Sequence, residues 1–286
     1  MEPVSGVWVV LHRVGPDKSG PLDSLRSDAS GRYRFDYVRS GSEDALYFVS
    51  AMHGGIAYFS RPLEQPRVGG TAGEITVFDT TSAKVPISIR GHHIVISAVD
   101  TRALRSVVEV FELSNDSSVT RVAANDRPEH ATWTTHLLPS ATNFRVTQGD
   151  IPTDAVAFAN GRASVFAPLA PGVKQFSFSY SVPASLFPLR LPLEGRTDVY
   201  EVLIEDETGS VTGPKIKEMD PVTVEGRNFR RFLGSDVPQS SIAVIDLPPA
   251  RAAGTAGTID PRYMVALTLL IGGTMIAALA RALGRR

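Results

Sequence analysis

The stretch Gln175-Phe-Ser-Phe-Ser-Tyr180 decides the fold class, because aromatic and polar residues alternate along it. Successive side chains of a β-strand point to opposite faces of a sheet, so Phe176, Phe178 and Tyr180 are predicted to face a core together. Similar short runs recur about every 8 to 12 residues, with glycine, proline, asparagine and aspartate between them. This rhythm is typical of an all-β protein composed of β-sandwiches.

Runs of the same kind are predicted as strands on both sides of this stretch. In the first 66 residues they are Gly6–Val14, Leu22–Ser27, Tyr33–Val38, Ala45–Met52 and Ile56–Ser60. Gly54-Gly55 separates the last two and predicts a hairpin there. Between residues 74 and 166 they are Glu74–Asp79, Val85–Arg90, Ile94–Val99, Val107–Leu113, Val119–Val122, Trp133–Leu138, Phe144–Thr147, Ala155–Ala159 and Ala163–Phe166. After residue 183 they are Leu189–Leu193, Val199–Ile204, Val222–Val224, Phe229–Leu233 and Ile242–Asp246.

Turn residues and prolines divide this series of strands into modules. Residues 1–66 are predicted to form one sandwich, residues 67–74 a glycine-containing linker and residues 75–182 an immunoglobulin-like sandwich. Prolines at 183, 188 and 192 mark the next join, so residues 183–248 are either a second sandwich or a continuation of the previous one. The predicted order ends with a Pro/Gly/Ala linker (249–262), a transmembrane helix (263–280) and a basic tail (281–286).

The transmembrane prediction rests on Tyr263–Ala280, which contains no charged residue and no proline. As a helix this stretch would be roughly 27 Å long, close to the thickness of a bilayer's hydrocarbon core. A buried core helix is the alternative. Tyr263 and the arginines Arg281, Arg285 and Arg286 would then anchor the helix at the two membrane interfaces.

Small residues gather along one side of the predicted helix. They are Thr268, Gly272, Gly273, Ala277 and Ala280. Small residues spaced by four let two helices approach closely in a membrane, which favours packing against another membrane protein. The alternative is that glycine and alanine are simply common in membrane spans.

Charge indicates the orientation and excludes nucleic acid as a partner. The last 26 residues hold four arginines and no acidic residue, so they carry a charge of +4. The net charge of the chain is −1, so the other 260 residues carry −5. Arginines after the span place the tail in the cytoplasm and the body in the periplasm of a bacterium, on the inner membrane. An acidic body without a lysine or arginine cluster does not suit nucleic acid. The absence of cysteine excludes disulfides, thiol catalysis and thiolate metal sites.

The N-terminal residues resemble a known family. Pro3-Val4-x-Gly6-Val7, Asp28-x-x-Gly31-x-Tyr33-x-Phe35 and Tyr47-Phe48-Val49 are similar to the carboxypeptidase regulatory-like, or transthyretin-like, domain. This resemblance implies a β-sandwich on an exported or surface protein, with a stabilising or binding role. The whole chain also resembles uncharacterised bacterial membrane-anchored proteins in which such a domain precedes a segment like Ala170–Tyr180.

The family's opening strand has no counterpart before Pro3, and a sandwich short of one strand would leave an exposed edge. Either upstream residues are missing from this sequence or another chain supplies the strand. The start Met1-Glu-Pro-Val-Ser-Gly6 also lacks the basic and apolar regions of a signal peptide. The chain shown therefore either begins at a non-native start or belongs to a cytosolic tail-anchored protein.

Candidate catalytic, cofactor and metal residues are not predicted. Gly91-His92-His93, between two predicted strands, is expected to form a hairpin turn with solvated histidines that point to opposite faces. A soft-metal site at Met52 and His53 is the weaker alternative. The acidic run Glu205–Glu207 is expected to be an exposed turn rather than a cation site. No Gly-x-Ser-x-Gly nucleophile motif occurs in the sequence, and an enzyme is not expected.

Two functions are compatible with these observations. The first is an accessory or structural subunit that docks its sandwich body and its span onto a larger integral membrane complex. The second is a membrane-anchored binding module for a glycan, peptide or small molecule, with exposed aromatic residues such as Trp133 or Tyr58 as contacts. Aromatic residues on the flank of a sandwich, next to an open edge, would favour docking.

Overall fold

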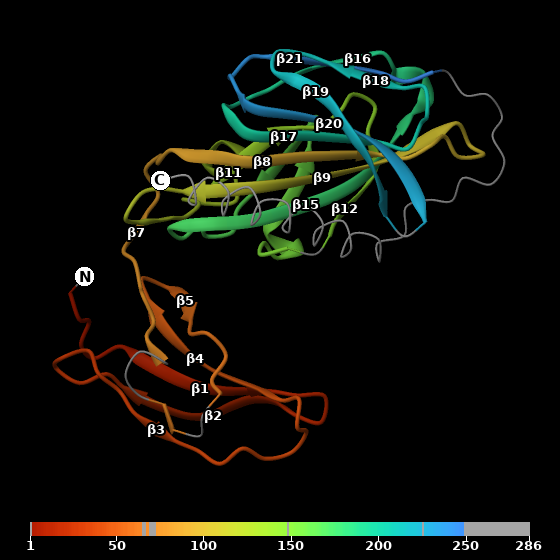
Figure 1. Ribbon diagram of the computed structural model, residues 1–286. Helices are drawn as coiled ribbons and strands as arrows, with labels where there is room; N and C mark the ends of the chain where they lie inside the picture. The colour runs from red at the N-terminus through yellow and green to blue at the C-terminus, as the bar shows by residue number, and fades with distance from the viewer. Residues whose placement is uncertain (1, 65–66, 69–72, 148, 225, 249–286) are drawn as a thin grey trace, which may run out of the picture. The chain divides into compact units, whose positions relative to one another are not determined.

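The computed structural model describes residues 2–64, 67–68, 73–147, 149–224 and 226–248, which form a β-sandwich-like all-β fold (Figure 1). The chain divides into two compact units. The first unit contains Met1–Thr81 and Ser118–Thr120, and the second unit contains Ser82–Ser117 and the residues from Arg121 on. The predicted span, its linker and its tail lie outside the described residues. Within the described ranges, no helix is long and apolar enough to cross a membrane.

The first unit contains a four-stranded antiparallel sheet in the order β2–β1–β4–β5. Its strands are β1 (Trp8–Val14), β2 (Ser19–Arg26), β4 (Leu46–His53) and β5 (Ile56–Phe59). A second, two-stranded sheet pairs β3 (Phe35–Asp36) with β6 (Arg67–Val68), and a further short pair joins β7 (Thr80–Thr81) to β10 (Thr120–Arg121).

Alternation along these strands explains the core of the first unit. Val9 and Leu11 of β1 and Tyr47 and Val49 of β4 are all buried and pack with Phe35. The β4–β5 hairpin turns at the two predicted glycines, which both have positive φ. The alternating burial predicted for Tyr33–Val38 is present, but only Phe35–Asp36 pairs with another strand. The strand predicted at Glu74–Asp79 does not form.

The second unit is built on a seven-stranded sheet in the order β12–β15–β9–β8–β17–β20–β19. All neighbours are antiparallel except β8 and β17, which run parallel. The strands are β8 (Ile87–Ile96), β9 (Leu104–Asn115), β12 (Thr142–Val146), β15 (Gly172–Pro183), β17 (Thr197–Ile204), β19 (Ile216–Val224) and β20 (Arg227–Val237). Strands from both sides of residue 183 therefore belong to one sheet.

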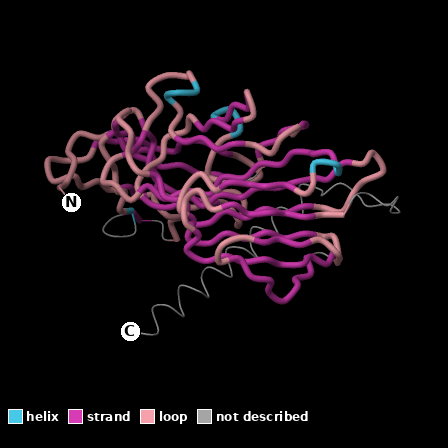
Figure 2. Tube along the Cα trace, turned by 90° about the horizontal axis from the view of Figure 1, so that it is seen from above, coloured by secondary structure: helices cyan, strands magenta, loops and turns pink. Residues whose placement is uncertain are grey.

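Two three-stranded sheets pack against one face of the seven-stranded sheet and enclose the core. Their orders are β11–β14–β13 and β16–β21–β18. Their strands are β11 (Trp133–His136), β13 (Val156–Ala159), β14 (Arg162–Val165), β16 (Leu189–Pro192), β18 (Ser210–Thr212) and β21 (Ile242–Asp246). Among the described residues of the second unit, helix is confined to three 3-10 turns, Pro128–His130, Thr153–Ala155 and Ala184–Leu186 (Figure 2).

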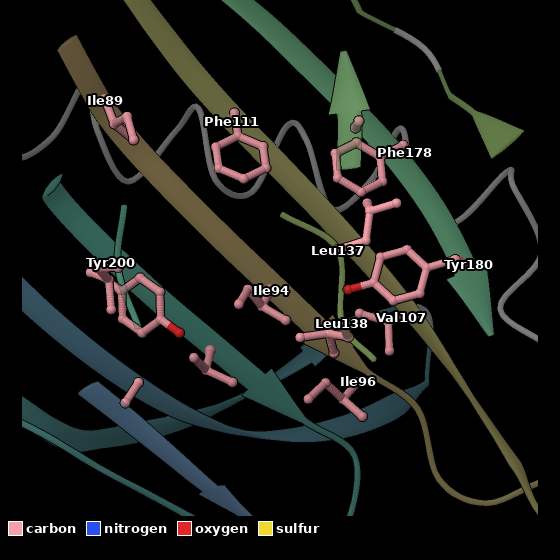
Figure 3. Close-up of a cluster of buried hydrophobic side chains, with 14 of the residues drawn as sticks. Ile89, Ile94, Ile96, Val107, Phe111, Leu137, Leu138, Phe178, Tyr180 and Tyr200 are labelled. Carbon is pink, nitrogen blue, oxygen red and sulfur yellow. The ribbon is translucent and has the colours of Figure 1, made fainter. Parts of the chain in front are cut away.

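The core of the second unit confirms the alternation that decided the fold class. Phe176, Phe178 and Tyr180 of β15 are fully buried on the face that meets the smaller sheets. Figure 3 shows Phe178 between Phe111 of β9 and Tyr180, and the rings of Phe111 and Phe178 stack with centroids 6.1 Å apart. Burying such rings contributes about 1.5–3 kcal/mol each, so this strand is a main source of the unit's stability.

The turn predicted at Gly91-His92-His93 is wrong, because β8 continues through it as one strand. A register shift against β9 between Ile89 and Gly91 marks a bulge, which explains the turn-like composition of this stretch. A Cβ at Gly91 would lie 2.7 Å from His93 Nε2 and 2.9 Å from Glu112 Oε2. Close packing of these side chains, rather than a turn, therefore explains the glycine.

Candidate functional site

The outward side of the four-stranded sheet in the first unit carries apolar side chains on β1, β4 and β5, while β2 contributes Ser19, Ser24 and Arg26 there. On β1, β4 and β5 the residues that alternate with the core residues include Trp8, Val14, Leu46, Met52 and Phe59, and all five are exposed. Phe59 is 61% exposed and Trp8 is 48% exposed. The water-facing side of an antiparallel sheet is normally polar, so this outer apolar face is unusual.

Contacts between strands join several side chains of the outer apolar face. Phe48 stacks on His12 with ring centroids 5.1 Å apart and meets Phe59 edge-on at 5.8 Å. The Arg26 guanidinium lies over the Trp8 ring, 4.6 Å from its centroid. Burial lowers the pKa of His12 below its ordinary value, so this imidazole is neutral at pH 7. The face thus carries little charge at its centre.

Open edges flank the outer apolar face. Strands β2 and β5 end the sheet on its two sides, and neither has a further partner strand among the described residues. Strand β2 contains Gly20 and Pro21, which disfavour pairing, whereas β5 is short and apolar. The structure therefore places aromatic residues on the flank of the first unit, next to an edge that is available for pairing.

A buried polar chain lies on the core side of the seven-stranded sheet. His92 Nε2 lies 2.7 Å from Glu109 Oε2 on the neighbouring strand, and the Tyr180 hydroxyl donates a hydrogen bond to Glu109 Oε1. Because the carboxylate accepts both hydrogen bonds, we assign the imidazole proton to Nε2. The His92 ring is fixed by stacking on Phe111, with centroids 4.0 Å apart. The Tyr180–Glu109–His92 chain thus holds one imidazole in a defined tautomer and orientation.

A separate polar chain lies on the opposite side of the same sheet. His93 Nδ1 lies 2.8 Å from Glu201 Oε2 of β17, and Glu201 Oε1 accepts a hydrogen bond from Arg231 Nε at 2.5 Å. Burial raises the pKa of Glu201, but His93 and Arg231 outweigh this effect and lower it overall, so the side chain is a carboxylate. His93 Nε2 and Glu112 Oε2 are buried without a hydrogen-bond partner in the described structure.

A pocket opens onto the first polar chain. It has a volume of about 190 Å³, and its polar lining includes His92, Glu109, Thr135 and Glu194. The rest of its lining is mainly aliphatic, contributed by β8, β16 and the segments around them. At the rim, Glu194 is held by His136 Nδ1 at 2.8 Å. A wider, polar depression of about 440 Å³ adjoins it and shares Ile89, Thr135 and Glu194.

The structure corrects the expectation of solvated histidines at this point. His92 and His93 are buried, although they point to opposite faces as predicted. Their partners Glu109 and Glu201 lie 17 and 108 residues away in the chain. A sequence signal for them exists, because each glutamate interrupts an otherwise apolar strand, as in Val107-Val-Glu109-Val-Phe111. Such a charge inside a buried strand requires a partner.

Other candidates from the sequence are dispersed. Met52 is exposed, while His53 pairs with Asp79 at 3.0 Å. Among the described residues, no group of three His, Cys, Asp or Glu side chains is placed to hold a metal ion. Tyr58 is buried and Trp133 half-buried, so neither is the exposed contact that the binding hypothesis expected.

The acidic run at 205–207 is not a simple exposed turn. Glu205 is half-buried and bonds both Arg227 and the backbone amide of Ala98, at 2.7 Å for the amide. Asp206 pairs with the buried Arg105 at 3.1 Å, and only Glu207 is exposed. These carboxylates serve as ion-pair partners that tie strand ends together.

The residues predicted to act in the membrane lie outside the described ranges. They are the helix-packing residues Thr268, Gly272, Gly273, Ala277 and Ala280, and the interface anchors Tyr263, Arg281, Arg285 and Arg286. The outer apolar face and the pocket are therefore the two candidate sites in the described structure.

Comparison with known proteins adds no family. No protein-family model matches the chain, and no curated protein matches it. The class that the structure defines is an all-β, sandwich-like protein of two units, with an apolar sheet flank in one and a polar-floored pocket in the other.

Proposed function

We propose that the protein is a non-catalytic accessory subunit that docks its first unit onto a larger integral membrane complex. The outer apolar face is the observation that carries this proposal. Exposed aromatic and aliphatic side chains cluster there beside an open strand edge, as at the centres of protein interfaces. Keeping such a face in water is unfavourable, and covering it with a partner recovers about 25 cal/mol for each Å² of apolar surface.

The sequence beyond the described residues supports a membrane protein as the partner. The uncharged stretch 263–280 suits a single span of the inner membrane, and its small-residue side suits packing against another helix. The three arginines after it favour a cytoplasmic tail and a periplasmic body. We propose a respiratory, photosynthetic or secretion complex as the class of partner, with lipid around the span and no nucleic acid.

The modular assignment belongs to the same proposal. We propose that the first unit is a transthyretin-like module and the second unit an immunoglobulin-like one. The two sheets of the first unit around a common core support the former, and the sandwich of the second unit supports the latter. Non-catalytic modules of these classes suit a stabilising or binding role.

The decisive experiment tests the outer apolar face directly. Native membranes are solubilised in a mild detergent, the protein is captured through a tag on its body, and co-purified proteins are identified by mass spectrometry. We expect a stoichiometric set of integral membrane proteins with the wild type, and its loss with the double variant Trp8→Glu, Phe59→Glu. Both side chains are exposed, so the variant preserves the core.

A matched control is available on the same chain. Val38 and Val173 are 84% and 57% exposed and do not belong to the outer apolar face. The double variant Val38→Glu, Val173→Glu adds the same charge and should retain the whole set. Recovery of the wild type without companions, or retention of the set by the Trp8 and Phe59 variant, would overturn the proposal.

A further inference from the structure

The 190 Å³ pocket of the second unit has the properties of a small-molecule site that docking does not require. Apolar side chains make up most of its wall, including Ile89, Phe111, Leu137, Leu189 and Leu191. An apolar cavity of about 150 Å³ is sufficient to bind a benzene-sized molecule. The volume therefore suits a molecule about one aromatic ring in size.

His92 supplies the directional element of the pocket. The residue is 9% exposed, and its side chain keeps 11% of its surface accessible. Its Nε2 is engaged by Glu109, and no other hydrogen bond to this ring exists within the described residues. In the neutral imidazole the remaining nitrogen, Nδ1, carries a lone pair that can accept a hydrogen bond.

The surroundings of His92 hold that acceptor in place. Glu109 is only 3% exposed and is bonded from its other oxygen by Tyr180, so it cannot rotate away without losing two hydrogen bonds. Phe111 stacks on one side of the imidazole, and Tyr200 meets it edge-on with centroids 5.4 Å apart. An oriented acceptor in an apolar wall is the usual arrangement by which a pocket selects one polar group.

Charge restricts the ligand further. The Glu109 carboxylate lies in the floor, while Glu194 and the exposed Arg190 also line the pocket, so an anion that reached His92 would meet the Glu109 carboxylate. A cation would have to lose its hydration in an apolar pocket whose acids are already paired with His92 and His136. A neutral molecule avoids both costs.

We propose that this pocket binds a neutral, ring-sized molecule that is apolar except for one O–H or N–H donor, which bonds His92 Nδ1. Phenols and small aromatic amides are the chemical class. This site is independent of the outer apolar face, which belongs to the other unit.

The test uses the full-length protein in mild detergent and ¹⁹F NMR titration of 4-fluorophenol, fluorobenzene and 4-fluorobenzoate. We expect 4-fluorophenol to bind about three- to ten-fold more tightly than fluorobenzene, the factor that one net hydrogen bond supplies. The benzoate should not bind. Equal affinity for the phenol and the fluorobenzene, or preferential binding of the benzoate, would refute the assignment to His92.

Variants locate the binding in this pocket. Leu191→Trp fills the pocket from a half-buried position and should abolish binding of 4-fluorophenol. Leu22→Trp, a substitution of the same size at an exposed leucine of the first unit, should leave it unchanged. The pair His92→Phe, Glu109→Gln should equalise the phenol and the fluorobenzene. Unaltered binding in Leu191→Trp would place the ligand elsewhere and overturn the proposal, whether or not the double variant folds.

Discussion

His92 of β8 and Glu109 of β9 are joined by a 2.7 Å hydrogen bond inside the core of the second unit, under a pocket of about 190 Å³. The glutamate is almost fully buried, so its two oxygens rely on the hydrogen bonds that His92 and Tyr180 supply. This relationship makes the polar chain both a stabilising element and the floor of a site. The two roles can be separated by substitution.

Tyr180→Phe should destabilise the second unit by about 1–3 kcal/mol, because it removes a donor from a buried carboxylate. Tyr200→Phe is the matched control. The Tyr200 hydroxyl is equally buried but has no hydrogen-bond partner in the described structure, so its removal should leave stability unchanged or higher. Urea unfolding of both variants measures the difference, and equal effects would contradict the assigned hydrogen bond.

Gly91→Ala should destabilise the protein by about 1–3 kcal/mol through overpacking. The added methyl would lie 2.7 Å from His93 Nε2, and His93 is held by Glu201. Gly195→Ala provides the comparison, since its Cβ would meet only the flexible end of Ile89, at 3.2 Å. Thermal unfolding should show a clear loss for the first substitution and a small one for the second. The bulge interpretation fails if the two losses are alike.

Asp17→Asn should lower stability at neutral pH but not in acid. Hydrogen bonds from Arg13 and Ser42 hold the pKa of Asp17 well below its usual range. A depressed folded-state pKa stabilises the protein above the unfolded value of about 3.9, and this contribution is lost as the pH falls towards the folded value. Urea midpoints measured across this range should converge for wild type and variant at low pH. Asp44→Asn, at an exposed carboxyl, is the control, and its urea midpoints should follow those of the wild type across the whole range.

Glu112→Gln should show the opposite dependence. Burial raises the pKa of Glu112, with a smaller opposing effect from His93. The folded state then binds the proton more tightly than the unfolded state, so the carboxylate costs stability as the pH rises above about 4.3. The glutamine variant should be more stable than wild type at pH 7, and the gain should disappear in acid. A gain that is constant with pH, or a loss at pH 7, would contradict a buried and unpartnered carboxylate.

Local patterns in the sequence predicted most of the strands. The alternation at Phe176, Phe178 and Tyr180 and the glycine pair of the β4–β5 hairpin are both confirmed, because each depends on neighbours within a few residues. The outer apolar face also has a local signal, since Trp8 and Phe48 occupy the positions that alternate with core residues. Two apolar faces on one strand predict either a sheet buried on both sides or a docking surface.

The polar chains could not be predicted in the same way. Glu201 reaches His93 only because β17 lies parallel to β8, and such a pairing leaves no trace in either strand. The turn predicted at Gly91 is wrong for a related reason, because the bulge at Arg90 is visible only in the pairing of β8 with β9. Glycine is typical both of turns and of close side-chain packing, and only the position of Glu112 across the sheet distinguishes them.

The parallel pairing of β8 with β17 also has a consequence for how the chain is made. Strand β8 ends at Ile96 and β17 begins at Thr197, so about 100 residues are translated between them, which takes roughly 5–20 s. During that interval β8 has β9 on one side and no neighbour on the other, although it belongs at the middle of the finished sheet. An apolar strand that waits for its partner is prone to pair with other chains, so the late arrival of β17 is a step at which misassembly competes with folding.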